Sequence, residues 1–166
     1  MKHLPVRKNI RLKDYDYSQP GYYFVTICTV NRIAWLGDVN VGQGLCSCRL
    51  SEIGNMVEIE LRRLGQRYDN LNIDKYVIMP NHVHAIIVLT QRREQSPRPT
   101  TTMVDIVCVL KSITTKTFNK MNNTSGKTLW QSRFHDHIIR NDEEYQRLWQ
   151  YIDENPARWN DDCYHA

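Results

Sequence analysis

Two apolar segments joined by a Pro-Asn pair constrain the fold of this chain more than any other feature. Residues 71–79 read LNIDKYVIM and residues 82–89 read HVHAIIVL, and both are rich in the β-branched residues that favour strands. Pro80 and Asn81 are typical turn residues, because proline presets φ and asparagine tolerates turn geometry. The pattern predicts two strands joined by a tight turn, with the apolar end of the second strand buried on both faces.

Two further segments have the composition of strands. Residues 22–30, YYFVTICTV, follow a Pro-Gly turn, and residues 134–139 read FHDHII. Residues 37–50 carry Gly-Gln-Gly between short alternating pieces and predict a minor hairpin or a loop.

Three segments have helical periodicity. Ser51 can cap a helix that runs to about Leu64, and residues 102–121 place their apolar side chains along one stripe. Asn141 can cap a last helix, with Glu144 in the capping-box position. Pro156 ends this helix, because the residue before a proline is pushed out of helical geometry.

The order of these elements predicts an α+β fold. The first six match the β-α-β-β-α-β arrangement of ferredoxin-like folds, which is an antiparallel sheet with helices on one face, and an additional C-terminal helix follows. The 166 residues suit a single domain, residues 1–166, and 41% apolar with 24% charged residues is typical of a globular chain. No apolar run reaches the roughly 20 residues of a membrane span, so we expect no membrane partner.

The charge is mildly basic. The formal net charge is +4, a weak bias toward anionic partners. Positive residues gather near the N-terminus, at Arg7, Lys8 and Arg11, and Arg133 and Arg140 flank the last predicted strand. The five cysteines have no signal peptide before them, which favours reduced thiols and a cytoplasmic protein.

Two H-x-H pairs are candidate metal ligands. His82 and His84 are separated by one residue on a strand, so both imidazoles leave the same face and can share one cation. His135 and His137 repeat this spacing, and the two pairs together would suggest a zinc hydrolase. For the second pair, an exposed His135 and a hydrogen-bonded His137 is the favoured interpretation.

The last helix offers a nucleophile. Tyr151 lies at the edge of the apolar stripe, where its hydroxyl can turn into a cleft. Asn155 follows four residues later and is therefore its neighbour on one face of the helix. The pattern alone leaves open that Tyr151 is an ordinary interfacial tyrosine.

Four segments together carry a resemblance to a known family. They read YDYSQPGYYFVTICT, VIMPNHVHAIIV, IVCVLKSITT and LWQSRFHDHIIRN…YIDENPARW. The chain resembles the small single-tyrosine HUH transposases, named for a histidine–hydrophobic–histidine motif. Within them it is most similar to the REP-associated tyrosine transposases. The resemblance covers about residues 11–162.

The resemblance implies a catalytic set and a reaction. His82 and His84 would be the HUH histidines, Tyr151 the nucleophile and Asn155 a third metal ligand, where relatives often use glutamine. The implied reaction is cleavage and rejoining of single-stranded or hairpin DNA through a 5′-phosphotyrosine, with Mg²⁺ or Mn²⁺ as cofactor.

The positions of the basic residues suggest where DNA would bind. Arg7, Lys8 and Arg11 would form a DNA-binding arm, and Arg133 and Arg140 would add contacts. The protein would be a monomer or homodimer, cytoplasmic and associated with the nucleoid. The alternatives are the zinc hydrolase and a non-catalytic nucleic-acid-binding module.

Overall fold

The computed structural model describes residues 15–42, 45–91, 101–161 and 163. It contains six strands, three α-helices and two short 3₁₀ helices, in the following order: β1 Gly21–Cys28, η1 Val30–Arg32, β2 Gly37–Gly42, β3 Leu45–Leu50, α1 Glu52–Arg67, β4 Leu71–Met79, β5 His82–Leu89, α2 Met103–Met121, β6 His135–Ile139, α3 Asp142–Glu154 and η2 Asn155–Asp161.

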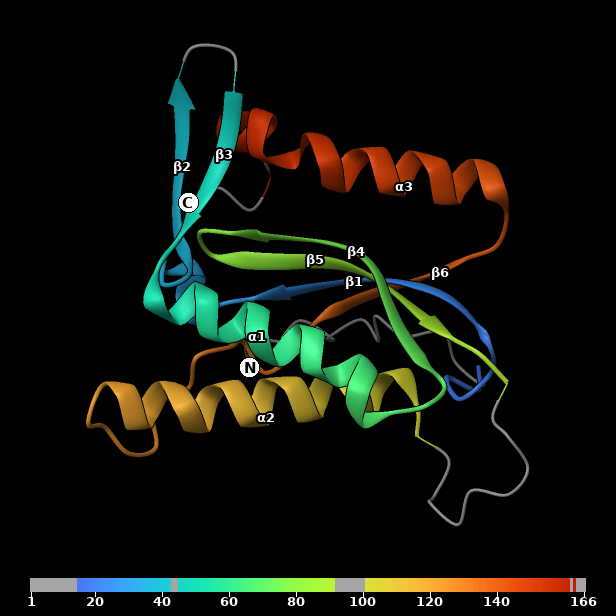
Figure 1. Cartoon of the computed structure of the whole chain (residues 1–166), viewed down its shortest axis with the longest axis horizontal. Helices are drawn as coiled ribbons and strands as arrows, with labels where there is room; N and C mark the ends of the chain where they lie inside the picture. The colour runs from blue at the N-terminus through green and yellow to red at the C-terminus, as the bar shows by residue number, and fades with distance from the viewer. Residues whose placement is uncertain (1–14, 43–44, 92–100, 162, 164–166) are drawn as a thin grey trace, which may run out of the picture.

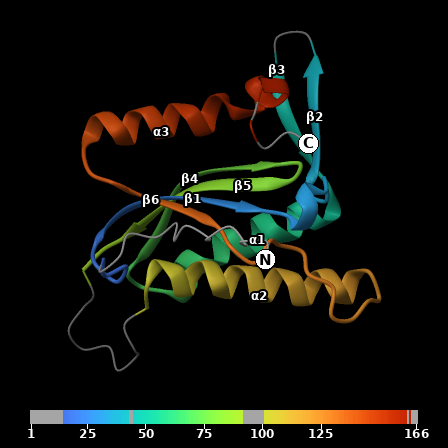
Figure 2. The same cartoon turned by 180° about the vertical axis from the view of Figure 1, so that it is seen from behind.

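Four strands form one antiparallel sheet in the order β4-β5-β1-β6. This is the sheet of a β-α-β-β-α-β fold, in which α1 and α2 make the two crossovers. Helices α1 and α2 lie on one side of the sheet and α3 crosses the other side, as both views show (Figures 1 and 2). The predicted α+β class, with an additional C-terminal helix, is confirmed.

The two faces of β5 belong to different layers of the core. Val83, Ala85 and Ile87 pack in the large cluster with the buried residues of α1 and α2. Ile86 packs in a smaller cluster with Ile152 of α3. Because side chains alternate along a strand, both histidines of β5 share the face of Ile86 and look toward α3.

Several element boundaries differ from the sequence prediction by a few residues. Strand β1 ends at Cys28, because residues 30–32 turn into η1 with Asn31 and Arg32 at positive φ. Helix α1 continues past Leu64 to Arg67, since its polar last turn adds no apolar residue to the periodic pattern. Strands β2 and β3 form the expected minor hairpin, in which Gly37 pairs with Leu50 at one end and Gly42 pairs with Leu45 at the other.

The start of α3 is capped in one direction only. Asn141 Oδ1 accepts a hydrogen bond from the backbone N–H of Glu144 at 2.8 Å. The Glu144 carboxylate accepts the backbone N–H of Arg140 at 2.9 Å, so the capping box predicted between Asn141 and Glu144 forms only its first half.

None of the helices in the described parts of the chain is long and apolar enough to cross a membrane.

Candidate active site

His82 and His84 form the centre of a buried polar cluster on the α3 face of the sheet. Their ring centroids lie 4.5 Å apart, and the residues are 0% and 1% exposed. Burial lowers the pKa of His84 well below its usual range, and the nearby imidazoles of His82 and His135 lower it further. His84 is therefore neutral at physiological pH, the form in which imidazole donates a lone pair.

Each histidine is held by a polar side chain at Nδ1. His82 Nδ1 donates to Asn81 Oδ1 at 2.8 Å, and the amide nitrogen of Asn81 donates in turn to the carbonyl of Arg32 at 3.2 Å. His84 Nδ1 lies 2.8 Å from Thr26 Oγ1, on the neighbouring strand β1. The proton on Nδ1 of His82 leaves a lone pair on its Nε2, and His84 has the same tautomer when its Nδ1 donates to Thr26. This is the tautomer of a metal-binding histidine.

Tyr151 of α3 brings its hydroxyl to this cluster. Its Oη lies 3.3 Å from His84 Nε2, and its ring meets the His84 ring edge-on at 5.2 Å. Phe24 stacks on His84 with ring centroids 5.3 Å apart and contacts Tyr151 at 6.1 Å. The half-buried phenol is thus fixed by aromatic packing beside a neutral imidazole.

Asn155 and Trp159 continue the cover of the site beyond the end of α3. Trp159 of η2 lies 6.0 Å from His82, with its ring tilted by 31°. Asn155 is 2% exposed, and its buried Oδ1 has no hydrogen-bond partner in the described part of the chain. In the sequence it lies midway between Tyr151 and Trp159, whose rings contact His84 and His82 respectively. A buried amide oxygen of this kind costs free energy unless a ligand satisfies it.

The second H-x-H pair does not join the first in a metal site. His135 is exposed, and His137 Nε2 lies 2.6 Å from Glu144 Oε1, as the favoured interpretation predicted. Within the described residues, no group of three or more His, Cys, Asp or Glu side chains could hold a metal ion. The geometry therefore gives no support to a zinc hydrolase built on both pairs.

The candidate DNA-binding residues lie apart from one another. Arg133 and Arg140 are exposed just before and just after β6. Arg133 is near the strand end whose His135 pairs with Thr26, which puts it on the side of the histidine cluster. Arg140 lies at the opposite end of β6. The predicted arm of Arg7, Lys8 and Arg11 is outside the described residues.

Sequence reasoning did not single out Thr26, Asn81 and Trp159. Asn81 directly precedes the first histidine, but an asparagine after a proline is typical of a turn and does not by itself indicate a contact with the histidine. Thr26 faces His84 only because of the register between β1 and β5, which no local pattern reveals. Trp159 follows the proline that was expected to end the helical region, whereas the chain continues in η2.

The comparisons with known proteins identify the family of this chain. The family model of IS200-like transposases matches residues 49–155, a span that includes both histidines, Tyr151 and Asn155. The chain belongs to this family of transposases, which are enzymes that act on DNA. This confirms the predicted resemblance to small transposases.

Individual proteins are also similar to this chain. An uncharacterized protein of Haemophilus influenzae is 32% identical over 170 residues, which cover 94% of this chain and 91% of that protein. A REP-associated tyrosine transposase, solved bound to a REP hairpin, is similar in structure. Its TM-score is 0.62 at 22% identity, over 89% of this chain and 73% of that one.

A crystal structure from Deinococcus radiodurans, assigned as a transposase, is also similar. The TM-score is 0.51 at 17% identity, over 87% of this chain and 95% of that one. At these identities the two structures support the fold.

Proposed function

We propose that this protein cleaves and rejoins single-stranded DNA with Tyr151 as its nucleophile. The observation that carries the proposal is the hydroxyl of Tyr151 at 3.3 Å from Nε2 of His84, beside a second buried histidine. A phenol is a weak nucleophile, because at a pKa of about 10 roughly one in a thousand is ionised at neutral pH. It needs an environment that stabilises charge on the reacting phosphate.

The proposed step is a transesterification. The phenolic oxygen of Tyr151 forms a bond to the scissile phosphorus, and the bond from that phosphorus to the 3′-oxygen breaks. The phenol loses its proton and the leaving 3′-oxygen gains one, so atoms balance. The product is a 5′-phosphotyrosine and a free 3′-hydroxyl. Because the covalent bond retains the energy of the phosphodiester, a second 3′-hydroxyl can attack it without ATP.

The residues at the site fit a divalent cation. His82 and His84 would each supply an imidazole nitrogen, and the unsatisfied Oδ1 of Asn155 would supply an oxygen. Imidazole ligands favour Mn²⁺ over Mg²⁺ on grounds of softness, and either ion accepts the amide oxygen. When bound, the cation would neutralise charge on the phosphate and orient it in line with the phenol.

The remaining contacts support the same chemistry. Asn81 holds the proton of His82 on Nδ1, and Thr26 orients the ring of His84 through its Nδ1. Phe24 and Trp159 pack against them and limit access of water. The protein is proposed to act as a monomer or a homodimer.

The substrate is proposed to be single-stranded or hairpin DNA. The hairpin bound by the REP-associated relative supports this choice, and Arg133 and Arg140 offer exposed cations along β6. Arg7, Lys8 and Arg11 stay a prediction for further phosphate contacts. Action on DNA suits a cytoplasmic, nucleoid-associated protein of one domain.

The direct experiment is incubation with single-stranded hairpin DNA and Mn²⁺, followed by a denaturing gel. We expect a protein–DNA adduct that excess chelator prevents. DNA binding without any adduct would favour the non-catalytic module. Tightly bound stoichiometric zinc, with a hydrolysis that Tyr151→Phe leaves unchanged, would favour the zinc enzyme.

A further inference from the structure

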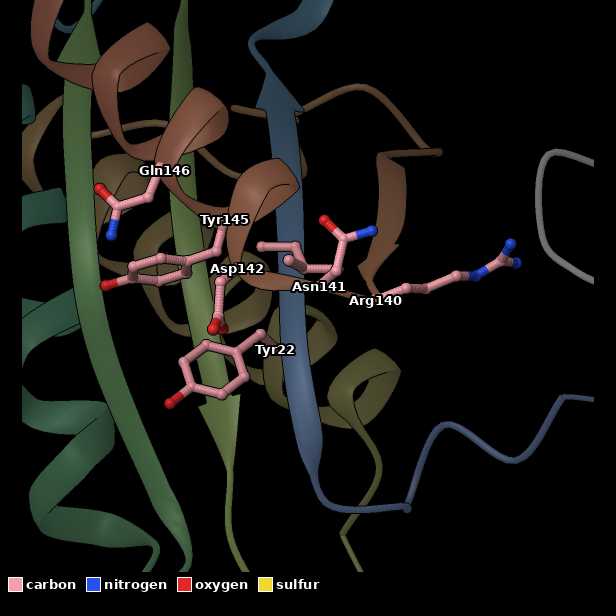
Figure 3. A pocket seen from close by; sticks show the side chains of 7 residues that line it. Tyr22, Arg140, Asn141, Asp142, Tyr145 and Gln146 are labelled. Atoms are coloured by element: carbon pink, nitrogen blue, oxygen red, sulfur yellow. The ribbon is translucent and has the colours of Figure 1, made fainter.

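A cleft lies at the opposite end of α3 from Tyr151. Its volume is about 430 Å³, within the range of small-molecule sites, and it is bounded by the start of β1, the end of β6 and the first turns of α3. The rings of Tyr22 and Tyr145 form its aromatic walls, with centroids 5.4 Å apart and planes at 75° (Figure 3).

The two tyrosines differ in how firmly they are held. Tyr145 donates its hydroxyl hydrogen to Asp74 Oδ2 at 2.6 Å, and this contact raises the pKa of Tyr145 to about 12. Its ring is therefore a fixed, neutral wall. Tyr22 is 44% exposed, a large value for an aromatic side chain in the sheet. An exposed ring beside a fixed one is a surface on which a flat ligand can stack.

One carboxylate and one guanidinium line the cleft, and they face the aromatic rings differently. Asp142 lines it, and its carboxylate points toward the ring of Tyr22, whereas the side chain of Arg140 extends away from both rings (Figure 3). A carboxylate repels a phosphate but accepts hydrogen bonds from an amino group. Adenine, cytosine and guanine carry an exocyclic amino group and thymine does not, so the cleft suits an amino-bearing nucleobase.

The cleft is connected to the candidate active site along two elements. On β1, Tyr22, Phe24 and Thr26 alternate onto one face, and Phe24 stacks on His84. On α3, Tyr145 precedes Tyr151 by six residues, which is about 9 Å along a helix. At about 3.4 Å per stacked nucleotide, this distance spans roughly two or three nucleotides.

We propose that this cleft binds one unpaired nucleobase of the DNA strand that is cut at Tyr151. The base stacks on Tyr22 and donates its amino hydrogen to Asp142, two or three nucleotides from the scissile phosphate. The inference rests on the proposed function and deepens it, because it gives the protein a base preference beside the cut.

The test measures binding rather than cleavage. Labelled oligo(dC) and oligo(dT) are titrated with the Tyr151→Phe protein, and binding is measured by fluorescence anisotropy. Each strand has about 12 nucleotides, a length within the usual site sizes of proteins that bind single strands. The two pyrimidine strands differ in the amino group. We expect oligo(dC) to bind about fivefold more tightly or better, and Asp142→Ala to reduce this ratio to within about twofold.

Two matched variants separate the cleft from general charge and from folding. Glu143 is the neighbouring exposed carboxylate and does not line the cleft, so Glu143→Ala removes the same charge and is expected to leave the ratio unchanged. Tyr22→Ala is expected to weaken binding of both strands about fivefold or more, and Tyr22→Phe to retain it.

Binding of both strands without preference for oligo(dC) overturns the cleft proposal and leaves the proposed function standing. The cleft proposal also fails if Glu143→Ala changes the ratio as much as Asp142→Ala, or if Tyr22→Ala leaves affinity unchanged. If Tyr22→Ala does not fold, the Asp142 and Glu143 variants still decide. Failure of the Tyr151→Phe protein to bind either strand at low salt contradicts the proposed function itself.

Discussion

The hydroxyl of Tyr151 lies 3.3 Å from Nε2 of His84, although the two residues are 67 positions apart in the sequence. The contact exists because α3 crosses the face of the sheet that carries both histidines of β5 (Figure 1). Nucleophile candidate and metal-ligand candidates thus come together within a single chain.

Thr26→Val is expected to weaken metal binding while the fold survives. The change keeps the shape of the side chain but removes the hydroxyl at 2.8 Å from His84 Nδ1. Loss of such an outer partner costs about 10–100-fold in metal affinity, so the Mn²⁺ concentration for half-maximal cleavage is expected to rise by that factor.

Thr114→Val is the matched control for this prediction. Thr114 is also fully buried, and its hydroxyl accepts a hydrogen bond from Trp130 Nε1 at 2.8 Å. Its loss is expected to lower the free energy of unfolding by about 1–3 kcal/mol and to leave the metal requirement unchanged. An equal rise in the Mn²⁺ requirement for both variants would show that Thr26 acts only through stability.

The two H-x-H pairs are expected to differ sharply. His82→Ala and His84→Ala should abolish adduct formation, because each removes a proposed ligand from a buried pair. His135 is exposed, so His135→Ala should retain at least about a tenth of the rate. A loss of up to about tenfold is smaller than the loss expected when one strong transition-state contact is removed. Complete loss of activity in the His135 variant would restore the zinc site built on both pairs.

Asn155→Ala is expected to give an intermediate loss of cleavage that higher metal concentration partly rescues. The reason is the buried Oδ1, which accepts no hydrogen bond in the described part of the chain and is proposed to bind the cation. Rates at increasing Mn²⁺ check the prediction. A loss that no metal concentration relieves would assign Asn155 a structural role at the end of α3.

Single strands and DNA that flanks a hairpin are expected to be cut faster than uniform duplex. Tyr151 is half-buried against the sheet, so the scissile phosphate has to be presented in line with it. Melting a duplex for this purpose costs a few kcal/mol. Affinity is also expected to fall as salt rises, since phosphate contacts release counterions. Equal rates on perfect duplex and single strand would refute the prediction.

Local patterns were sufficient for the elements that carry the histidines and the tyrosine. Strands β4 and β5 have the predicted limits, because a Pro-Asn turn between two β-branched segments allows few alternatives. The shared face of His82 and His84 follows from alternation alone. The neighbourhood of Tyr151 and Asn155 follows from helical spacing.

The partners of these residues depend on contacts between distant segments. Thr26 contacts His84, 58 positions away in the sequence, because the register of β1 against β5 places the two residues opposite each other. Trp159 contacts His82 because the chain continues as η2 past Pro156. The cleft lined by Tyr22 and Tyr145 forms only because the start of β1 and the start of α3 lie together. No periodicity in one segment predicts such pairings, which are set by packing of the whole sheet.

The most direct test of the central claim compares Tyr151→Phe with Tyr76→Phe. Each change removes only a hydroxyl group. Tyr76 lies on β4, where its hydroxyl donates to Glu58 Oε1 at 2.8 Å, so its loss should cost about 1 kcal/mol of stability and no cleavage. Tyr151→Phe should bind DNA but form no adduct, and peptide mapping of the unaltered protein should recover the phosphotyrosine at Tyr151. An adduct in Tyr151→Phe, or mapping to Tyr145 or another tyrosine, would contradict the account.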